Sequence, residues 1–145
     1  MPRADLDTTL PPDIVFDGHN DTLVALHTPE PGKDRSFFER SDHGHLDLPR
    51  AVEGRFGGGL FAVCVPPTST GHDLPDFDAF VTDTGYEVPL PPPLDPAYAQ
   101  QMTIAVMARL FRLETESNGR LRVVRDVKEL MSCLRAGTIA AVLNF

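Results

Sequence analysis

Cysteine is scarce in this chain of 145 residues, which contains only Cys64 and Cys133. The two lie far apart in the sequence, each within an apolar stretch, and no Cys-x-x-Cys spacing occurs. The sequence therefore excludes a disulfide scaffold and a paired-cysteine metal or redox site. We expect two buried free thiols.

Long apolar runs and an excess of positive charge are also missing. No run approaches the roughly 20 apolar residues needed to cross a bilayer, so no transmembrane segment is expected. Thirteen basic residues stand against 21 acidic ones, and this net charge of −8 argues against a nucleic-acid-binding surface. Residues 1–7 carry acids where a signal peptide needs basic and then apolar residues, so the default expectation is a cytoplasmic location.

The chain alternates apolar strands with helical patterns. Strands are predicted at residues 14–16, 59–65, 121–124 and 138–145. Helices are predicted at 21–26, 48–53 and 97–116, with a last one between a cap at 126 and a terminating glycine at 137. Asp47 should cap the helix at 48–53. Strand and helix in this order predict an α/β fold built from βαβ units around a parallel sheet.

Proline interrupts the pattern in the middle of the chain. Eight of the fourteen prolines fall between residues 66 and 96, so neither a helix nor a strand should run through this segment. We interpret it as an insertion loop of about 66–96 within a single domain, 1–145. A lid formed by its acidic and aromatic residues, among them Asp76, Phe77 and Tyr86, is an open alternative.

A metal-binding pattern follows the first predicted strand, which reads as buried. Residues 17–21, DGHND, place His19 and Asp21 two positions apart. Residues two apart in a strand face the same way, so the imidazole and the carboxylate can converge on one cation. Such donors suit zinc, and a catalytic zinc site uses about three protein ligands and one water. The plain alternative is a turn formed by Asp17 and Asn20 beside a strand-end histidine.

Two other polar runs compete for a functional role. Residues 43–47, HGHLD, contain ligand types but lie between a charged loop and a proline-containing helix start, which favours helix capping by Asp47. Residues 57–59, GGG, lack the lysine and hydroxyl of a phosphate loop and precede a strand, so they should form a tight entry into it.

Several blocks resemble the opening part of the membrane (renal-type) dipeptidase family, peptidase M19. They are residues 17–21 (DGHND), 45–50 (HLDLPR), 53–54 (EG), 57–63 (GGGLFAV) and 136–145 (AGTIAAVLNF). The resemblance implies a partial TIM (β/α)8 barrel, comprising the first three or so strand–helix units of a metal-dependent hydrolase barrel domain. A complete barrel needs about 250 residues, so we interpret the chain as a truncated N-terminal portion.

The resemblance also implies a function. It identifies His19 and Asp21 as ligands of one of two zinc ions in a dipeptidase, with a dipeptide as substrate and a homodimer as an open arrangement. The bridging glutamate, two further histidines and the groups that hold the substrate would all lie beyond Phe145. We therefore expect no complete catalytic set in this chain, which should be inactive alone.

Two alternatives remain open at this stage. Another barrel hydrolase acting on a cyclic amide or lactam would use similar ligands, although such enzymes usually show His-x-His after the first strand. A non-catalytic scaffold could retain the strands and lose the site. A fold alone does not decide between them.

Overall fold

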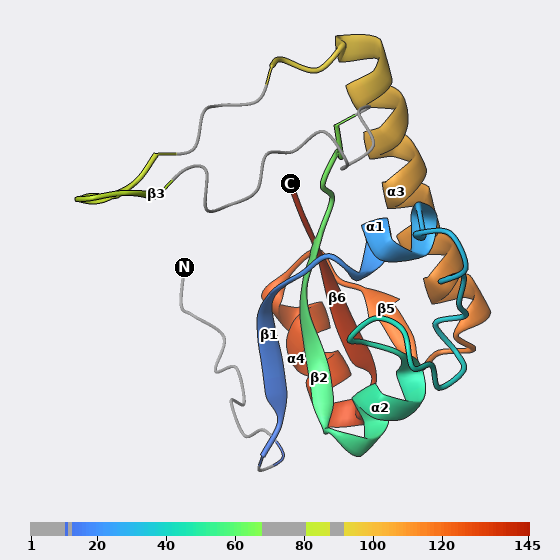
Figure 1. The fold of residues 1–145 in the computed structure, drawn as a ribbon. Coiled ribbons are helices and arrows are strands. Elements are labelled where there is room, and N and C mark those ends of the chain that lie inside the picture. The colour runs from blue at the N-terminus through green and yellow to red at the C-terminus, as the bar shows by residue number, and fades with distance from the viewer. Residues whose placement is uncertain (1–10, 12, 68–80, 88–91) are drawn as a thin grey trace, which may run out of the picture.

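The computed structural model describes residues 11, 13–67, 81–87 and 92–145. Its centre is a parallel sheet in the order β1-β2-β6-β5, and Figure 1 shows the helices around it. The strands are β1 (Val15–Asn20), β2 (Phe56–Ala62), β5 (Leu121–Val123) and β6 (Ile139–Asn144), with a separate antiparallel pair, β3 (Val81–Thr82) and β4 (Gly85–Tyr86). The helices are α1 (Thr22–His27), α2 (Leu48–Glu53), α3 (Pro96–Glu116) and α4 (Val127–Ala136).

Side-chain caps define where the helices begin. Asp47, Asp95 and Asp126 each accept a hydrogen bond from the backbone N–H three residues later, which satisfies an otherwise unpaired amide of the first turn. Gly137 ends α4 with a φ of 69°, a left-handed conformation that suits glycine. The predicted cap at Asp47 is confirmed.

The core lies on both faces of the sheet. Ile139 and Ala141 of β6 join the larger cluster, which contains the apolar faces of α1, α2 and α3. Ala140, between them, joins a smaller cluster with Cys133 of α4. Because successive strand residues point to opposite faces, α4 covers one face and the other three helices cover the opposite one. The four α3 residues that fill the core are Met102, Val106, Leu110 and Leu113.

Glycine allows close pairing between β2 and β6. A Cβ atom at Gly58 would lie 2.2 Å from the Ala140 carbonyl oxygen, which is far inside van der Waals contact. The predicted bounds of this strand, 59–65 with two of the three glycines before it, were wrong, since β2 covers Phe56–Ala62 and contains all three glycines. Close backbone approach explains why glycines stand inside a strand.

The first strand differs from expectation in burial and length. It extends to Asn20, and Val15 and Phe16, which were expected to be buried, are 51% and 41% exposed. The physical reason is position, because β1 stands at one edge of the sheet and pairs only with β2 among the described strands.

Three smaller outcomes concern the remaining predictions. Cys133 is buried as expected, whereas Cys64 is exposed because it follows the end of β2, so its predicted burial was wrong. The short β3–β4 hairpin lies inside the proline-rich segment, where no strand was expected; Asp76 and Phe77 lie outside the described residues. No helix in the described ranges is long and apolar enough to cross a membrane.

Candidate metal centre

His19 and Asp21 come together where β1 gives way to α1. The His19 Nε2 lies 3.4 Å from the Asp21 Oδ1, with the two side chains 58% and 63% exposed. The spacing argument assumed that both residues lie in the strand. His19 does belong to β1, but Asp21 is the N-cap residue of α1. The strand-to-helix turn therefore brings the pair together. Asp21 makes no side-chain capping hydrogen bond, so the helix does not occupy its carboxylate.

Polar side chains on either side hold this turn. Asp17 accepts hydrogen bonds from the His19 backbone N–H at 3.1 Å and from the Asn20 side-chain amide at 3.1 Å. The same Asn20 amide donates to the Leu60 carbonyl on β2 at 3.3 Å, which ties the turn to the neighbouring strand. Asp17 and Asn20 therefore act as the turn formers that the plain alternative described, while His19 and Asp21 project from the turn they make.

A cavity of about 430 Å³ opens beside the pair and is lined by both side chains. Its other walls include Arg35 and His45, from the loop between α1 and α2, and Phe56 at the start of β2. Small-molecule sites commonly occupy about 300–1,000 Å³, so this space suits a ligand of modest size. His45, which sequence reasoning set apart from His19 and Asp21, thus faces the same cavity.

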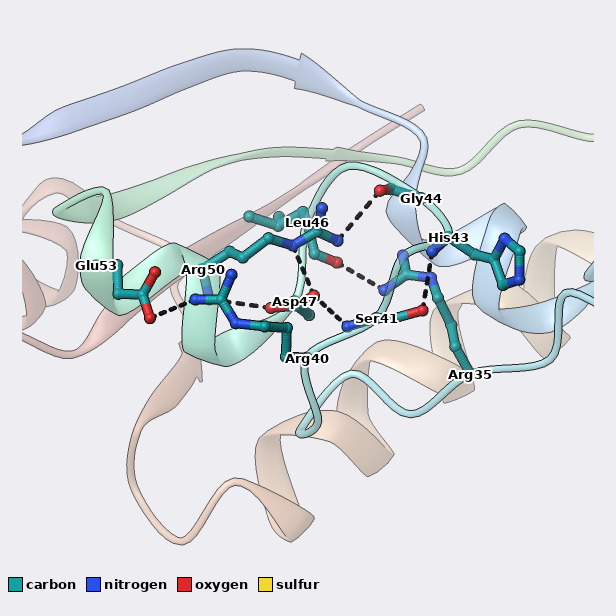
Figure 2. Close-up of polar contacts among 9 residues, drawn as sticks. All are labelled: Arg35, Arg40, Ser41, His43, Gly44, Leu46, Asp47, Arg50 and Glu53. Carbon is teal, nitrogen blue, oxygen red and sulfur yellow. Dashed lines mark hydrogen bonds and ion pairs between the residues drawn. The ribbon is translucent and has the colours of Figure 1, made fainter.

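A buried carboxylate organises the loop that forms this wall (Figure 2). Asp47 is fully buried and accepts hydrogen bonds from the Ser41 N–H at 3.1 Å, the Arg50 N–H at 2.9 Å and the Arg50 Nε at 2.7 Å. Arg50 also donates from Nη2 to the Gly44 carbonyl at 3.1 Å. Burial alone would raise the pKa of Asp47, but these hydrogen bonds and the Arg50 charge outweigh it, so the pKa lies below its ordinary value.

Arg35 stands in the same wall. Its Nη1 donates to the Leu46 carbonyl at 2.8 Å, and its guanidinium lies against Gly44. Partial burial and the nearby Arg50 charge lower the pKa of Arg35, and Asp47 opposes them. An arginine remains protonated under such shifts, so the cavity wall carries a positive charge.

His43, the other histidine of the run at residues 43–47, does not line this cavity. It is exposed, and its backbone N–H donates to Ser41 Oγ. No group of three histidine, cysteine or acidic side chains with metal-binding geometry occurs within the part of the chain that the structure describes. Sequence reasoning missed Arg35 altogether, because an arginine in a charged loop gives no local signal of what it faces.

A histidine and a carboxylate converge after the first strand of a parallel α/β sheet, and imidazole nitrogen and carboxylate oxygen are donors that divalent metal ions bind. The sequence model of the membrane dipeptidase family (peptidase family M19) matches residues 7–145. The chain belongs to this family.

Known relatives place the chain within a larger fold. It is 46% identical over 134 residues to an Acinetobacter calcoaceticus protein described as an uncharacterized protein in the PQQ-III 3' region, covering 90% of this chain and 39% of that protein. The crystal structure of dipeptidase AC, a family M19 metallopeptidase, matches with a TM-score of 0.73 and 37% identity, over 90% of this chain and 36% of that one.

A second solved structure carries a ligand. It is a metallopeptidase from Rhodobacter sphaeroides bound to a phosphinate mimic of the dipeptide L-Ala-D-Ala, with a TM-score of 0.75, 37% identity, and coverage of 90% of this chain and 37% of that one. The likeness confirms the predicted α/β fold as part of an M19 structure. The chain spans well under half the length of each of these relatives.

Proposed function

We propose that this chain forms the first metal-ligand segment of a zinc-dependent dipeptidase. The observation that carries the proposal is the approach of His19 Nε2 to Asp21 Oδ1, 3.4 Å apart beside a cavity, in a chain of the M19 family. The family metallopeptidase bound to a dipeptide mimic supports a dipeptide as the class of substrate.

The donor pair fits a zinc ion. Zinc binds imidazole nitrogen and carboxylate oxygen at about 2.0–2.2 Å, and two such ligands of one tetrahedral ion stand about 3.4 Å apart. His19 and Asp21 have that separation and that chemistry. Both side chains are more than half exposed, so an ion can reach them without rearrangement of the core.

Two residues of the turn are proposed to bind the ion, and two others to orient them. A bound divalent ion supplies Lewis-acid chemistry that lowers the pKa of water and polarises a peptide carbonyl. His19 and Asp21 would hold the ion, and Asp17 and Asn20 fix the backbone of the turn from which these two side chains extend. Asp17 and Asn20 would thus orient the two ligands before the ion binds, as hydrogen-bonding neighbours of metal ligands usually do.

The proposal includes ligands outside this chain. His19 and Asp21 are two donors, fewer than a catalytic zinc site requires. We propose that a bridging glutamate, two further histidines and a second zinc ion complete the site in the full-length protein, and that residues 1–145 alone hydrolyse no dipeptide. A lactam-hydrolysing relative and a non-catalytic scaffold are the competing outcomes.

Zinc content and substrate length test the proposal in the full-length protein. His19→Ala should remove zinc from one site and abolish hydrolysis of a dipeptide, whereas His45→Ala, in the same cavity, should keep its zinc by elemental analysis. Equal zinc loss in both variants would reject the ligand assignment.

A substrate series then separates the functions. The full-length enzyme should cleave a dipeptide and leave the matching tripeptide intact. Faster cleavage of the tripeptide or of a lactam than of the dipeptide would reject the dipeptidase assignment. Absence of any hydrolysis with zinc bound would also reject it. Activity of residues 1–145 alone with excess zinc would show that the site lies elsewhere.

A further inference from the structure

We propose that Arg35 is a carboxylate-binding residue of the cavity beside His19 and Asp21, and that it helps to select substrates that carry a free carboxylate. This inference rests on the proposed function and deepens it. It assigns a role to a side chain in the loop between α1 and α2, outside the metal ligands, and so places one substrate-holding group within this chain, whereas the resemblance implied that all of them lie beyond Phe145.

The first observation is the hydrogen bonding of Arg35. A guanidinium has five N–H donors in a planar fork, and one Arg35 nitrogen is used by the Leu46 carbonyl. Arg35 has no carboxylate within ion-pair distance among the described residues, although its guanidinium lines the cavity. Four other arginines do have carboxylate partners: Arg40 with Glu53, Arg50 with Asp47, Arg55 with Asp13 and Arg122 with Glu129.

The second observation is that the loop holds Arg35 in place. A Cβ atom at Gly44 would lie 2.7 Å from the Arg35 Nε, and Gly44 has a φ of 70°, so this glycine leaves room for the guanidinium. Arg50 donates to the Gly44 carbonyl and is itself paired with buried Asp47. A positioned arginine loses less side-chain entropy when it binds a carboxylate.

The charge balance of this wall also favours an anion. Partial burial and the neighbouring Arg50 charge both disfavour the charged form of Arg35, and a carboxylate bound to the guanidinium would offset the repulsion from Arg50. Asp17 also lines the cavity, but its oxygens accept hydrogen bonds from His19 and Asn20. Asp21 is the proposed metal ligand, so a bound cation offsets its charge.

Carboxylate is the ligand that matches this geometry and the proposed substrate. Two parallel N–H donors of a guanidinium bind both carboxylate oxygens, and such charge-assisted pairs are stronger than neutral hydrogen bonds. A dipeptide offers one carboxylate at its C-terminus and a second when its side chain is acidic. The experiment distinguishes these two sources.

Binding without turnover tests the inference directly. Three ligands, each with a non-hydrolysable phosphinate in place of the peptide bond, are titrated by calorimetry into the zinc-loaded full-length protein: the analogue of a neutral dipeptide, its C-terminal amide and an analogue with an acidic C-terminal side chain. Arg35→Gln should weaken binding of the carboxylate ligand about 10-fold, the loss of roughly one charge-assisted interaction. Arg35→Lys should restore part of it, because lysine keeps the charge without the fork.

Arg40→Gln is the matched control, since Arg40 lies on the same loop, pairs with Glu53 and does not line the cavity. It should leave all three affinities unchanged. A loss for the neutral dipeptide but not for its amide identifies the terminal carboxylate, and a loss confined to the acidic dipeptide identifies the side chain. Either result supports the inference.

Three outcomes would overturn it: unchanged binding in Arg35→Gln, an equal loss for all three ligands including the amide, or no binding by the wild-type protein. Far-UV circular dichroism shows whether each variant is folded. A zinc-loaded protein that binds dipeptides through Arg35 and hydrolyses none would refute the proposed function while leaving the carboxylate site intact.

Discussion

Replacing Asp47 should destabilise the protein far more than its position in a polar loop suggests. The carboxylate is fully buried, caps α2 through the Arg50 N–H, accepts from the Ser41 N–H and pairs with the Arg50 guanidinium. Asp47→Ala removes all of these acceptors at once. Asp47→Asn keeps the shape and one oxygen but loses the charge and turns an N–H group toward another donor.

The magnitude follows from the contacts. Loss of a helix cap costs about 1 kcal/mol, and loss of a charge-assisted hydrogen bond costs about 1.5–3 kcal/mol. The Ser41 amide, left without its acceptor, adds about 1 kcal/mol. Because Arg50 is 29% exposed and can recruit water, we expect about 3–4 kcal/mol for Asp47→Ala, near the lower end of the range for breaking a buried pair. Asp47→Asn should cost about 2 kcal/mol, since asparagine also caps helices.

Urea unfolding of the full-length protein, followed by circular dichroism, measures these differences. Glu53→Gln is the control, because Glu53 lies in the same helix and forms an exposed pair with Arg40. It should leave the unfolding midpoint unchanged. In a double-mutant cycle, Asp47→Asn and Arg50→Gln should be clearly non-additive. Additive effects, or a loss for Asp47→Ala no larger than that for Glu53→Gln, would refute the reasoning.

The same carboxylate predicts a pH dependence. Burial raises the pKa of Asp47, but the hydrogen bonds from Arg50 and Ser41 and the Arg50 charge together lower it by more, so the folded-state pKa lies below its ordinary value. A depressed pKa stabilises the fold above the unfolded-state value, about 3.9, and this contribution is lost as the pH falls through the folded-state pKa. Wild-type stability should therefore decline below about pH 4 more steeply than that of Asp47→Asn. Parallel pH profiles would contradict this assignment.

Two further predictions concern the sheet. Gly58→Ala should destabilise the protein by about 2–3 kcal/mol, because its Cβ would meet the Ala140 oxygen, whereas Gly18→Ala, with open space around it, should stay within about 0.5 kcal/mol in the same urea assay. Residues 1–145 expressed alone should self-associate through edge strand β1, where Val15 and Phe16 are exposed, and Phe16→Lys should lower the mass seen by light scattering. A monodisperse wild-type monomer would refute this second prediction.

Local patterns in the sequence determined much of the fold. The helical pattern over residues 97–116 predicted the helix whose Met102, Val106 and Leu110 fill the core, and the residue types at Asp47 and Gly137 predicted where α2 begins and where α4 ends. These features depend on contacts within a few residues, where periodicity and capping chemistry suffice. The approach of His19 to Asp21 was also predicted, because the two residues are close in sequence, and their role as ligands stays a proposal.

Contacts between distant segments could be decided only by the tertiary structure. Sequence did not show that β5 pairs outside β6, that β1 stands at an edge with Phe16 exposed, or that Gly58 allows close approach to Ala140. It also gave no sign that Arg35, fourteen positions beyond Asp21 in the numbering, faces the same cavity as His19 and Asp21. Residue type and spacing report local geometry, whereas a cavity is made by the packing of segments that meet only when the chain has folded.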